Sequence, residues 1–335
     1  MNGFRTSEFS LLASDLGYPE GPVYQSDGSV LVVEVQGGKL TRIKPDGTME
    51  TVANFSSDPN VPAGPNGAAI GPDGAIYICN NGGLTWSEIN ETPKNLRTQV
   101  PLFQPPNYTS GSIQRVSNGQ ITTLYTACNG VPLRSPDDLV FDKNGNFWFT
   151  DWGKLRLADR DITGIYYSQP DGKSISQAPQ HRFRSAPNGI ALSPKDDRLY
   201  VAETYARWIV YWQLNESGKI VPNKSTQDGS YLLTPDIPGQ LDSMAIDEEG
   251  NVYVATLLPK GQDPTVPGGI TVIGPQGKIL DFIELVVEGM PEPLPSNICF
   301  GGKDRRTAFI TLAGTGRLVS CEMKIPGKAL HFCTY

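Results

Sequence analysis

One sequence pattern occurs six times along this chain of 335 residues. Each copy has a proline or apolar residue, a polar residue and a small or polar residue, followed by two apolar runs around a turn of Gly, Asp or Asn. The polar residues are, in chain order, Glu20, Asn66, Asp137, Asn188, Asp242 and Ser296. Repeats of roughly 40–50 residues built from paired strands are typical of propeller blades. The pattern therefore predicts an all-β fold, a six-bladed β-propeller.

The spacing of the copies predicts how the blades divide the chain. The six polar residues are 46, 71, 51, 54 and 54 residues apart, so the second blade contains an insertion. Further hairpin patterns between the copies supply the outer strands. We expect the N-terminal FSLLAS to pair with residues 316–320 and complete the last blade. The prediction is one domain over residues 1–335, with a long, lid-like loop at about 84–110.

The equivalence of the six polar residues places them at one height beside the axis of a propeller. They include three carboxylates and two amides, with no Lys, Arg or His. Burying unpaired carboxylates together costs several kcal/mol each, so a positive charge is needed among them. Carboxylate and amide oxygens suit calcium or magnesium, and calcium tolerates an irregular shell of ligands. We therefore expect a central site for a divalent cation, with calcium favoured.

At this point the chain resembles a known family. The motifs YPEGPVY, SPDDLVFD, FTDWG, APNGIALSP, LYVAET, LDSMAID and SNICFGG are similar to those of the senescence marker protein/gluconolactonase/regucalcin family, across nearly the whole chain. The resemblance implies one catalytic calcium, with magnesium, manganese and zinc left open. Its implied ligands are Glu20, Asp137, Asn188 and Asp242. Asn66 and Asn80 resemble substrate-side positions, and Arg134, near Asp137, is a further candidate for binding substrate oxygens.

Two positions depart from the family pattern. Asp137 stands where most members have Asn, which adds a negative charge, although related staphylococcal lactonases resemble the chain here. Ser243 stands where many members have Gly.

The resemblance also implies a reaction, the calcium-dependent hydrolysis of a lactone or similar ester. The cation would polarise the carbonyl oxygen. Asp242 is the candidate base that activates water, or a direct nucleophile, and Asp137 is the alternative. Three other readings remain open: a phosphotriesterase that uses the same site, a non-catalytic calcium-binding propeller, and a condensing enzyme that resembles strictosidine synthase.

Composition limits the partners. The formal charge is −7 and there is no basic run, which argues against nucleic acid. No apolar stretch has the length of a signal peptide or of a membrane span. We therefore expect a cytoplasmic protein that acts on a small lactone or ester, without a membrane partner; the oligomeric state is left open. Five scattered cysteines indicate buried free thiols rather than disulfides or a zinc site.

Other polar residues are expected to lie outside the ring. The histidines, His181 and His331, fall away from it, and Asp138 is expected to have a structural role. Asp151 with Trp152, and Glu203 with Tyr205, end two strands and are expected opposite the metal mouth, where they would cap blades.

Overall fold

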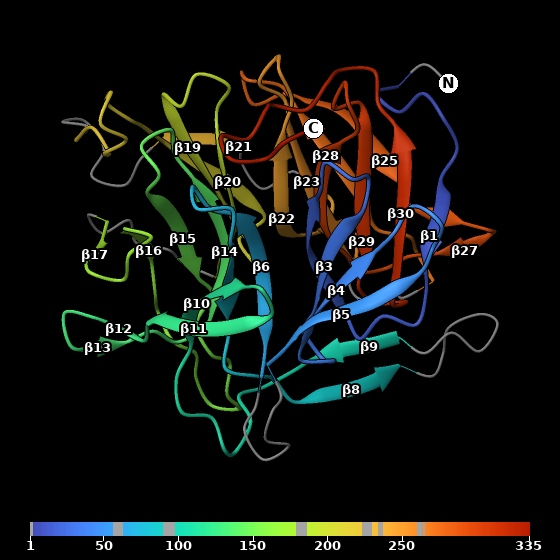
Figure 1. Cartoon of the computed structure of the whole chain (residues 1–335). Helices are drawn as coiled ribbons and strands as arrows, with labels where there is room; N and C mark the ends of the chain where they lie inside the picture. The colour runs from blue at the N-terminus through green and yellow to red at the C-terminus, as the bar shows by residue number, and fades with distance from the viewer. Residues whose placement is uncertain are drawn as a thin grey trace.

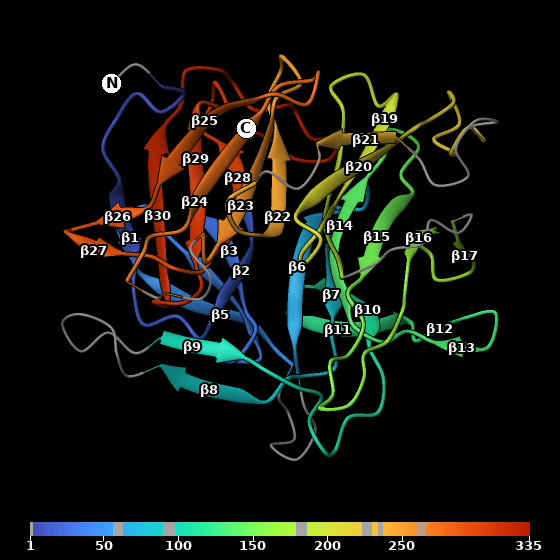
Figure 2. The same ribbon diagram turned by 180° about the vertical axis from the view of Figure 1, so that it is seen from behind.

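Six four-stranded antiparallel sheets surround a common axis (Figures 1 and 2). The computed structural model describes residues 3–55, 63–89, 98–178, 186–222, 230–233, 237–259, 263 and 265–335. Within these residues the sheets form the six-bladed β-propeller predicted from the repeats. No helix among the described residues is long and apolar enough to cross a membrane.

The blades follow the order of the chain, and each runs from an inner to an outer strand. The first three blades are β2 (Pro19–Tyr24), β3 (Val30–Glu34), β4 (Lys39–Ile43) and β5 (Met49–Asn54); β6 (Pro65–Ile70), β7 (Ile76–Asn80), β10 (Ser112–Ser117) and β11 (Gln120–Tyr125); and β14 (Pro136–Phe141), β15 (Phe147–Asp151), β16 (Ile165–Ser168) and β17 (Ile175–Gln177). The last three are β18 (Pro187–Leu192), β19 (Arg198–Glu203), β20 (Trp208–Gln213) and β21 (Ser230–Leu233); β22 (Gln240–Ile246), β23 (Val252–Leu257), β24 (Gly269–Ile273) and β25 (Ile279–Glu284); and β28 (Pro295–Gly301), β29 (Thr307–Leu312), β30 (Arg317–Glu322) and β1 (Ser10–Ala13).

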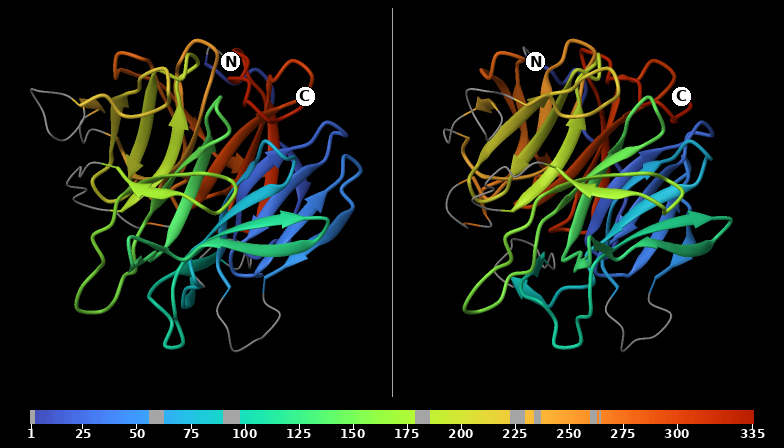
Figure 3. Two further views of the ribbon diagram at one scale, coloured as in Figure 1. Left: turned by 60° about the vertical axis from the view of Figure 1, so that its left-hand side comes forward. Right: turned by 90° about the vertical axis from the view of Figure 1, so that its left-hand side faces the viewer.

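The last blade closes the ring with strands from both ends of the chain. Strand β1 pairs antiparallel with β30, with Ser10 opposite Ser320 and Leu11 opposite Val319. Figure 3 shows the consequence, because the blue first blade and the red last blade lie side by side. The predicted pairing of FSLLAS with the C-terminal strand is confirmed.

Among the described residues, the hydrophobic core contains seven clusters; six of them are each shared by two neighbouring blades, and a small seventh consists of Tyr18, Val35 and Ala313. Strands carry alternating or continuous buried apolar residues because both faces of a blade pack on neighbours. Representative members of the six clusters are Val33 with Ile78, Tyr77 with Phe149, Trp148 with Leu199, Ala202 with Val254, Ala255 with Ile310, and Leu318 with Val32. This packing fixes the inner strands next to one another around the axis.

The insertion of the second blade differs from the predicted long loop. It contains a two-stranded sheet, β8 (Trp86–Ile89) with β9 (Thr98–Pro101), while residues 90–97 lie outside the described part. The sequence shows no clear period there because the strands are only four residues long. Two further short pairs, β12 (Ala127–Cys128) with β13 (Val131–Pro132) and β26 (Val286–Val287) with β27 (Met290–Pro291), precede the third and sixth blades.

The C-terminal segment covers the end of the channel opposite the insertion. In Figure 1 the β8–β9 hairpin lies at the bottom and the C-terminus at the top. Leu330, Phe332 and Tyr335 line a mainly apolar cavity of about 110 Å³ together with the inner strands. His331 Nε2 lies 2.5 Å from Asp196 Oδ2 at this end of the channel. His331 therefore lies outside the ring of repeated polar residues, as predicted. His181 is outside the described residues. All five cysteines are free, as expected.

Candidate functional site

The six repeated polar residues lie at the beginning of the six inner strands. Five of them occupy the second position of their strand, and Asp242 the third position of β22. Each inner strand contacts the inner strands of the two neighbouring blades. The repeat therefore brings these residues to one mouth of the channel, as the sequence predicted.

Small residues after the anchors let the inner strands approach closely. A Cβ atom at Gly67 would lie 2.5 Å from the Asp137 carbonyl oxygen, and one at Gly189 would lie 2.6 Å from that of Asp242. Real Cβ atoms do not approach backbone oxygens so closely, which explains the glycine after Asn66 and after Asn188. The polar side chains are thereby held around a narrow opening.

The negative charges of three carboxyl groups in this mouth repel one another. Glu20 is 3% exposed and Asp137 is 7% exposed. Burial raises the pKa of Glu20 to about 7, although hydrogen bonds from Asn297 and Gly21 oppose the shift. Burial, followed by the charges of Asp242 and Glu20, raises the pKa of Asp137 well above its usual range. Burial and the charge of Glu20 do the same to the pKa of Asp242. A cation between them would relieve this repulsion.

Asn188 presents an oxygen that has no hydrogen-bond partner among the residues that the structure describes. Its Nδ2 donates to Thr204 Oγ1 at 3.2 Å, which fixes the orientation of the carboxamide. The Oδ1 atom is buried and accepts no hydrogen bond from the described parts of the chain. A buried polar atom without a partner is costly. An oxygen of this kind, beside carboxylates, fits a hard cation.

Acidic side chains alone do not complete a metal site. Within the described parts of the chain, no three Asp, Glu, His or Cys side chains form a metal-binding cluster. A cation here would therefore need oxygen ligands besides carboxylates, and the amide oxygen of Asn188 is one that is available.

The remaining anchors differ in what they offer. Asn66 is half-buried at the start of β6. Ser296 is fully buried, and its hydroxyl donates to the Pro19 carbonyl oxygen at 2.8 Å, so it joins the last blade to the first. The next residue, Asn297, donates to Glu20 Oε2 at 2.9 Å. Asp138 lines the channel beneath the mouth, and burial raises its pKa to about 6.

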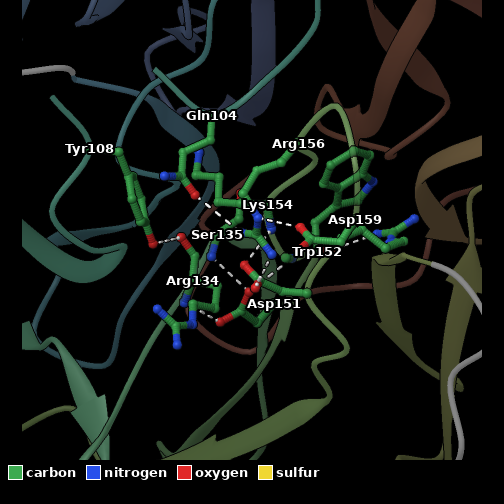
Figure 4. Close-up of polar contacts among 12 residues, drawn as sticks. Gln104, Tyr108, Arg134, Ser135, Asp151, Trp152, Lys154, Arg156 and Asp159 are labelled. Carbon is green, nitrogen blue, oxygen red and sulfur yellow. Dashed lines mark hydrogen bonds and ion pairs between the residues drawn. The ribbon is translucent and has the colours of Figure 1, made fainter. Parts of the chain in front are cut away.

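The ends of the second strands lie beside the mouth, so the expectation that they lie opposite was wrong. Pro136 pairs with Asp151, and Pro187 pairs with Glu203. The reason is the antiparallel hairpin, which returns the second strand to the level where the first begins. Asp151 accepts backbone N–H groups of Arg134 and Ser135, both at 2.7 Å (Figure 4). Its role as a cap is therefore consistent with the prediction, although its position is not.

Asn80 occupies the equivalent place in the second blade. Its Oδ1 accepts the N–H groups of Gly64 and Gly82, at 3.3 and 2.9 Å, and its Nδ2 donates to Gln114 at 2.9 Å. These bonds occupy the carboxamide within its own blade. Its assignment to substrate remains a prediction, and a structural role already accounts for the residue.

Arg134 lies between β13 and β14, at the rim rather than in the ring. Its carbonyl oxygen accepts a hydrogen bond from the Tyr108 hydroxyl at 2.6 Å. Its positive charge interacts with Tyr108 and Asp161, which belong to the rim loops of the second and third blades. Figure 4 shows its guanidinium pointing away from Asp151.

Two residues at the mouth were not singled out from the sequence. The fully buried Lys154 donates to the Gly83 carbonyl oxygen at 2.6 Å and lies 5.0 Å from the centre of the Tyr108 ring. Burial lowers the pKa of Lys154 to about 7. It also interacts electrostatically with Asp151 and Asp137. Lys154 thus ties the insertion to the third blade beside the carboxylates.

The second is Tyr18, directly before Pro19 and Glu20. Its φ of 58° is unusual for a bulky residue and holds the ring at the mouth. The ring lies 4.9 Å from that of Trp86, the first residue of the insertion's hairpin. Burial, and then the charges of Asp242 and Glu20, raise the pKa of Tyr18. The Tyr-Pro-Glu motif was the available sequence signal, but the backbone conformation is not readable from it.

Comparison with known proteins places these features in a family. A curated relative, a gluconolactonase of Zymomonas mobilis subsp. mobilis, is 27% identical over 91% of this chain and 79% of its own length. A solved gluconolactonase from Xanthomonas campestris has a TM-score of 0.69 at 19% identity, covering 96% of this chain and 91% of that one. A solved regucalcin from Agrobacterium tumefaciens, described as calcium-binding, has a TM-score of 0.67 at 15% identity, covering 100% and 99%.

These structural likenesses support the fold. The family model of the SMP-30/Gluconolactonase/LRE-like region matches residues 18–314, which include all six inner strands. The chain therefore belongs to the SMP-30/gluconolactonase/LRE-like family.

Proposed function

We propose that this protein is a lactonase, which opens a lactone or similar cyclic ester at the mouth that carries Glu20, Asn188 and Asp242. Family membership and the gluconolactonase of Zymomonas mobilis support this reaction class. The observation that carries the proposal is the unpartnered Oδ1 of Asn188, buried beside carboxyl groups of raised pKa.

The residues present fit a divalent cation. Its proposed ligands are Glu20, Asp137, Asn188 and Asp242, which supply only oxygen atoms. Calcium suits such a set better than zinc, which favours nitrogen and sulfur ligands. The regucalcin neighbour is described as calcium-binding, which is consistent with this choice. When bound, the cation would supply polarisation of the substrate carbonyl and compensation of the negative charge that develops on it.

The side chains around this site have separate proposed tasks. Asp242 accepts a proton from the attacking water and so acts as the general base; Asp137 is the alternative. Thr204 orients the Asn188 carboxamide, and Asn297 orients the Glu20 carboxylate, each through one hydrogen bond. Asn66 and Arg134 remain proposed contacts for substrate oxygens.

The test is a substrate panel. Purified protein with added calcium would be assayed on γ- and δ-lactones and on an aryl phosphotriester. We expect the lactones to be opened. Hydrolysis of the phosphotriester alone would instead favour a phosphotriesterase. A lack of turnover by protein that binds calcium would favour a non-catalytic calcium-binding propeller.

A further inference from the structure

Three residues of the third and fourth blades form a cluster at the rim of the mouth: Trp152, Arg160 and Tyr205. The Arg160 guanidinium carbon lies 5.0 Å from the Trp152 ring centre and 5.3 Å from that of Tyr205. The two rings are 5.8 Å apart and tilted by 56°. Arg160 Nη2 also donates to the Trp152 carbonyl oxygen at 2.9 Å. The guanidinium therefore lies against both aromatic rings, which also contact each other.

This cluster is connected directly to the candidate cation ligands. Trp152 Nε1 donates to Thr204 Oγ1 at 3.2 Å, and the same hydroxyl accepts the bond from Asn188. The Leu241 N–H donates to the Thr204 carbonyl oxygen at 3.2 Å. Since Asp242 follows Leu241 and Tyr205 follows Thr204, this bond links the segments that carry Asp242 and Tyr205. Tyr205 also interacts electrostatically with both Arg160 and Asp242. The cluster thus lies on the side of the mouth next to Asn188 and Asp242.

Among the described residues Arg160 has no carboxylate at ion-pair distance, in contrast to a neighbouring arginine in the same loop, although Asp161 and Glu203 interact with its charge at longer range. Arg156 forms an ion pair with Asp159 at 2.5 Å (Figure 4). It forms a second ion pair with Asp161 at 2.8 Å. Arg160 forms no ion pair within the parts of the chain that the structure describes, and its one side-chain hydrogen bond there uses Nη2. An arginine has five N–H donors. Arg160 is only partly buried and Tyr205 is 41% exposed, so this cluster lies at the surface of the molecule.

We propose that Arg160, held against Trp152 and Tyr205, binds a carboxylate on the substrate, and that the preferred substrates are carboxylate-bearing lactones. This inference rests on the proposed lactonase function and names its substrate class. The planar fork of a guanidinium matches the two oxygens of a carboxylate. Stacking on two rings fixes the guanidinium in advance, so little side-chain entropy is lost on binding. The lactone carbonyl then lies toward Asn188 and Asp242, the direction in which the cluster is connected.

The experiment compares two substrates that differ only in charge. One is a γ-lactone with a carboxylate on the ring, and the other is the same lactone with a carboxamide there. The proteins are the wild type, Arg160→Gln, Arg160→Lys and, as a control in the same loop, Arg156→Gln. We expect the wild type to favour the carboxylate in kcat/KM by about 10- to 100-fold, the range for hydrogen bonds to a charged group.

Arg160→Gln should remove this preference by raising the KM for the carboxylate lactone. Its kcat/KM for the carboxamide lactone should stay within about twofold of the wild-type value. Arg160→Lys should retain part of the preference because it keeps the charge and loses the fork. Arg156→Gln should keep the full preference. Equal losses on both substrates in Arg160→Gln, or no preference in the wild type, would overturn the inference and leave Arg160 a structural residue.

Failure of the proposed lactonase function can be distinguished from failure of the inference about Arg160. If neither lactone is hydrolysed, the proposed function is refuted. In that case the dissociation constants of the two lactones are measured by calorimetry for the same four proteins. The ratio of the two constants then tests the inference in place of the ratio of kcat/KM values.

Discussion

Replacing Glu20 by Gln should stabilise the metal-free protein at neutral pH while removing its stabilisation by calcium. Glu20 is 3% exposed, and burial raises its pKa from 4.5 to about 7. Between these values the folded state retains a proton that the unfolded chain has released. Unfolding therefore releases a proton, and the free energy of unfolding falls as the pH rises through this window. At about 1.36 kcal/mol per pH unit, the loss is about 3 kcal/mol by pH 8.

The assay is urea denaturation, followed by tryptophan fluorescence, between pH 5 and pH 8 in a chelator and again in calcium. In the chelator, the free energy of unfolding of Glu20→Gln should exceed that of the wild type by about 3 kcal/mol at pH 8, and the two values should differ little near pH 5. Calcium should stabilise the wild type and have little effect on the variant. The exposed Glu216→Gln is the control and should behave as the wild type. A Glu20→Gln variant that is no more stable at pH 8, or that calcium stabilises as much as the wild type, would refute the reasoning.

Three further substitutions test other parts of the site. Asn188→Leu should abolish calcium-dependent stabilisation, because it removes the unpartnered oxygen; a calcium titration that matches the wild type would contradict this. Asp242→Asn should lower kcat by about 10²- to 10⁴-fold, as expected for loss of a general base, with a smaller loss of calcium affinity than Glu20→Gln. Equal losses of affinity in the two variants would mean that their roles are not separate. Trp86→Ala removes the ring that packs on Tyr18 and should raise KM without changing calcium affinity; an unchanged KM in steady-state assays would remove the insertion from substrate binding.

The sequence alone was sufficient to predict the number of blades and their closure. Each inner hairpin is a local pattern of apolar runs around a turn, and six equivalent copies leave one symmetrical arrangement. The same equivalence predicted that Glu20, Asn188 and Asp242 lie together, because equivalent positions in a propeller share one height.

Side chains from the rim loops were not predictable in this way. Lys154, Tyr18 and Arg160 reach the mouth through contacts between different blades or through a positive φ, and none of these leaves a periodic signal. The misplaced end of β15 had a different cause. Asp151 was treated as the far end of a strand, although an antiparallel hairpin returns it to the mouth.

The central claim is that a bound cation and lactone hydrolysis belong to the same site. Metal-stripped protein would be titrated with calcium while the heat of binding and the rate of lactone opening are recorded on the same samples. We predict that both rise together and saturate at one calcium per chain, and that Asn188→Leu loses both. Full activity in the stripped protein, or calcium binding with no change in rate, would contradict the account.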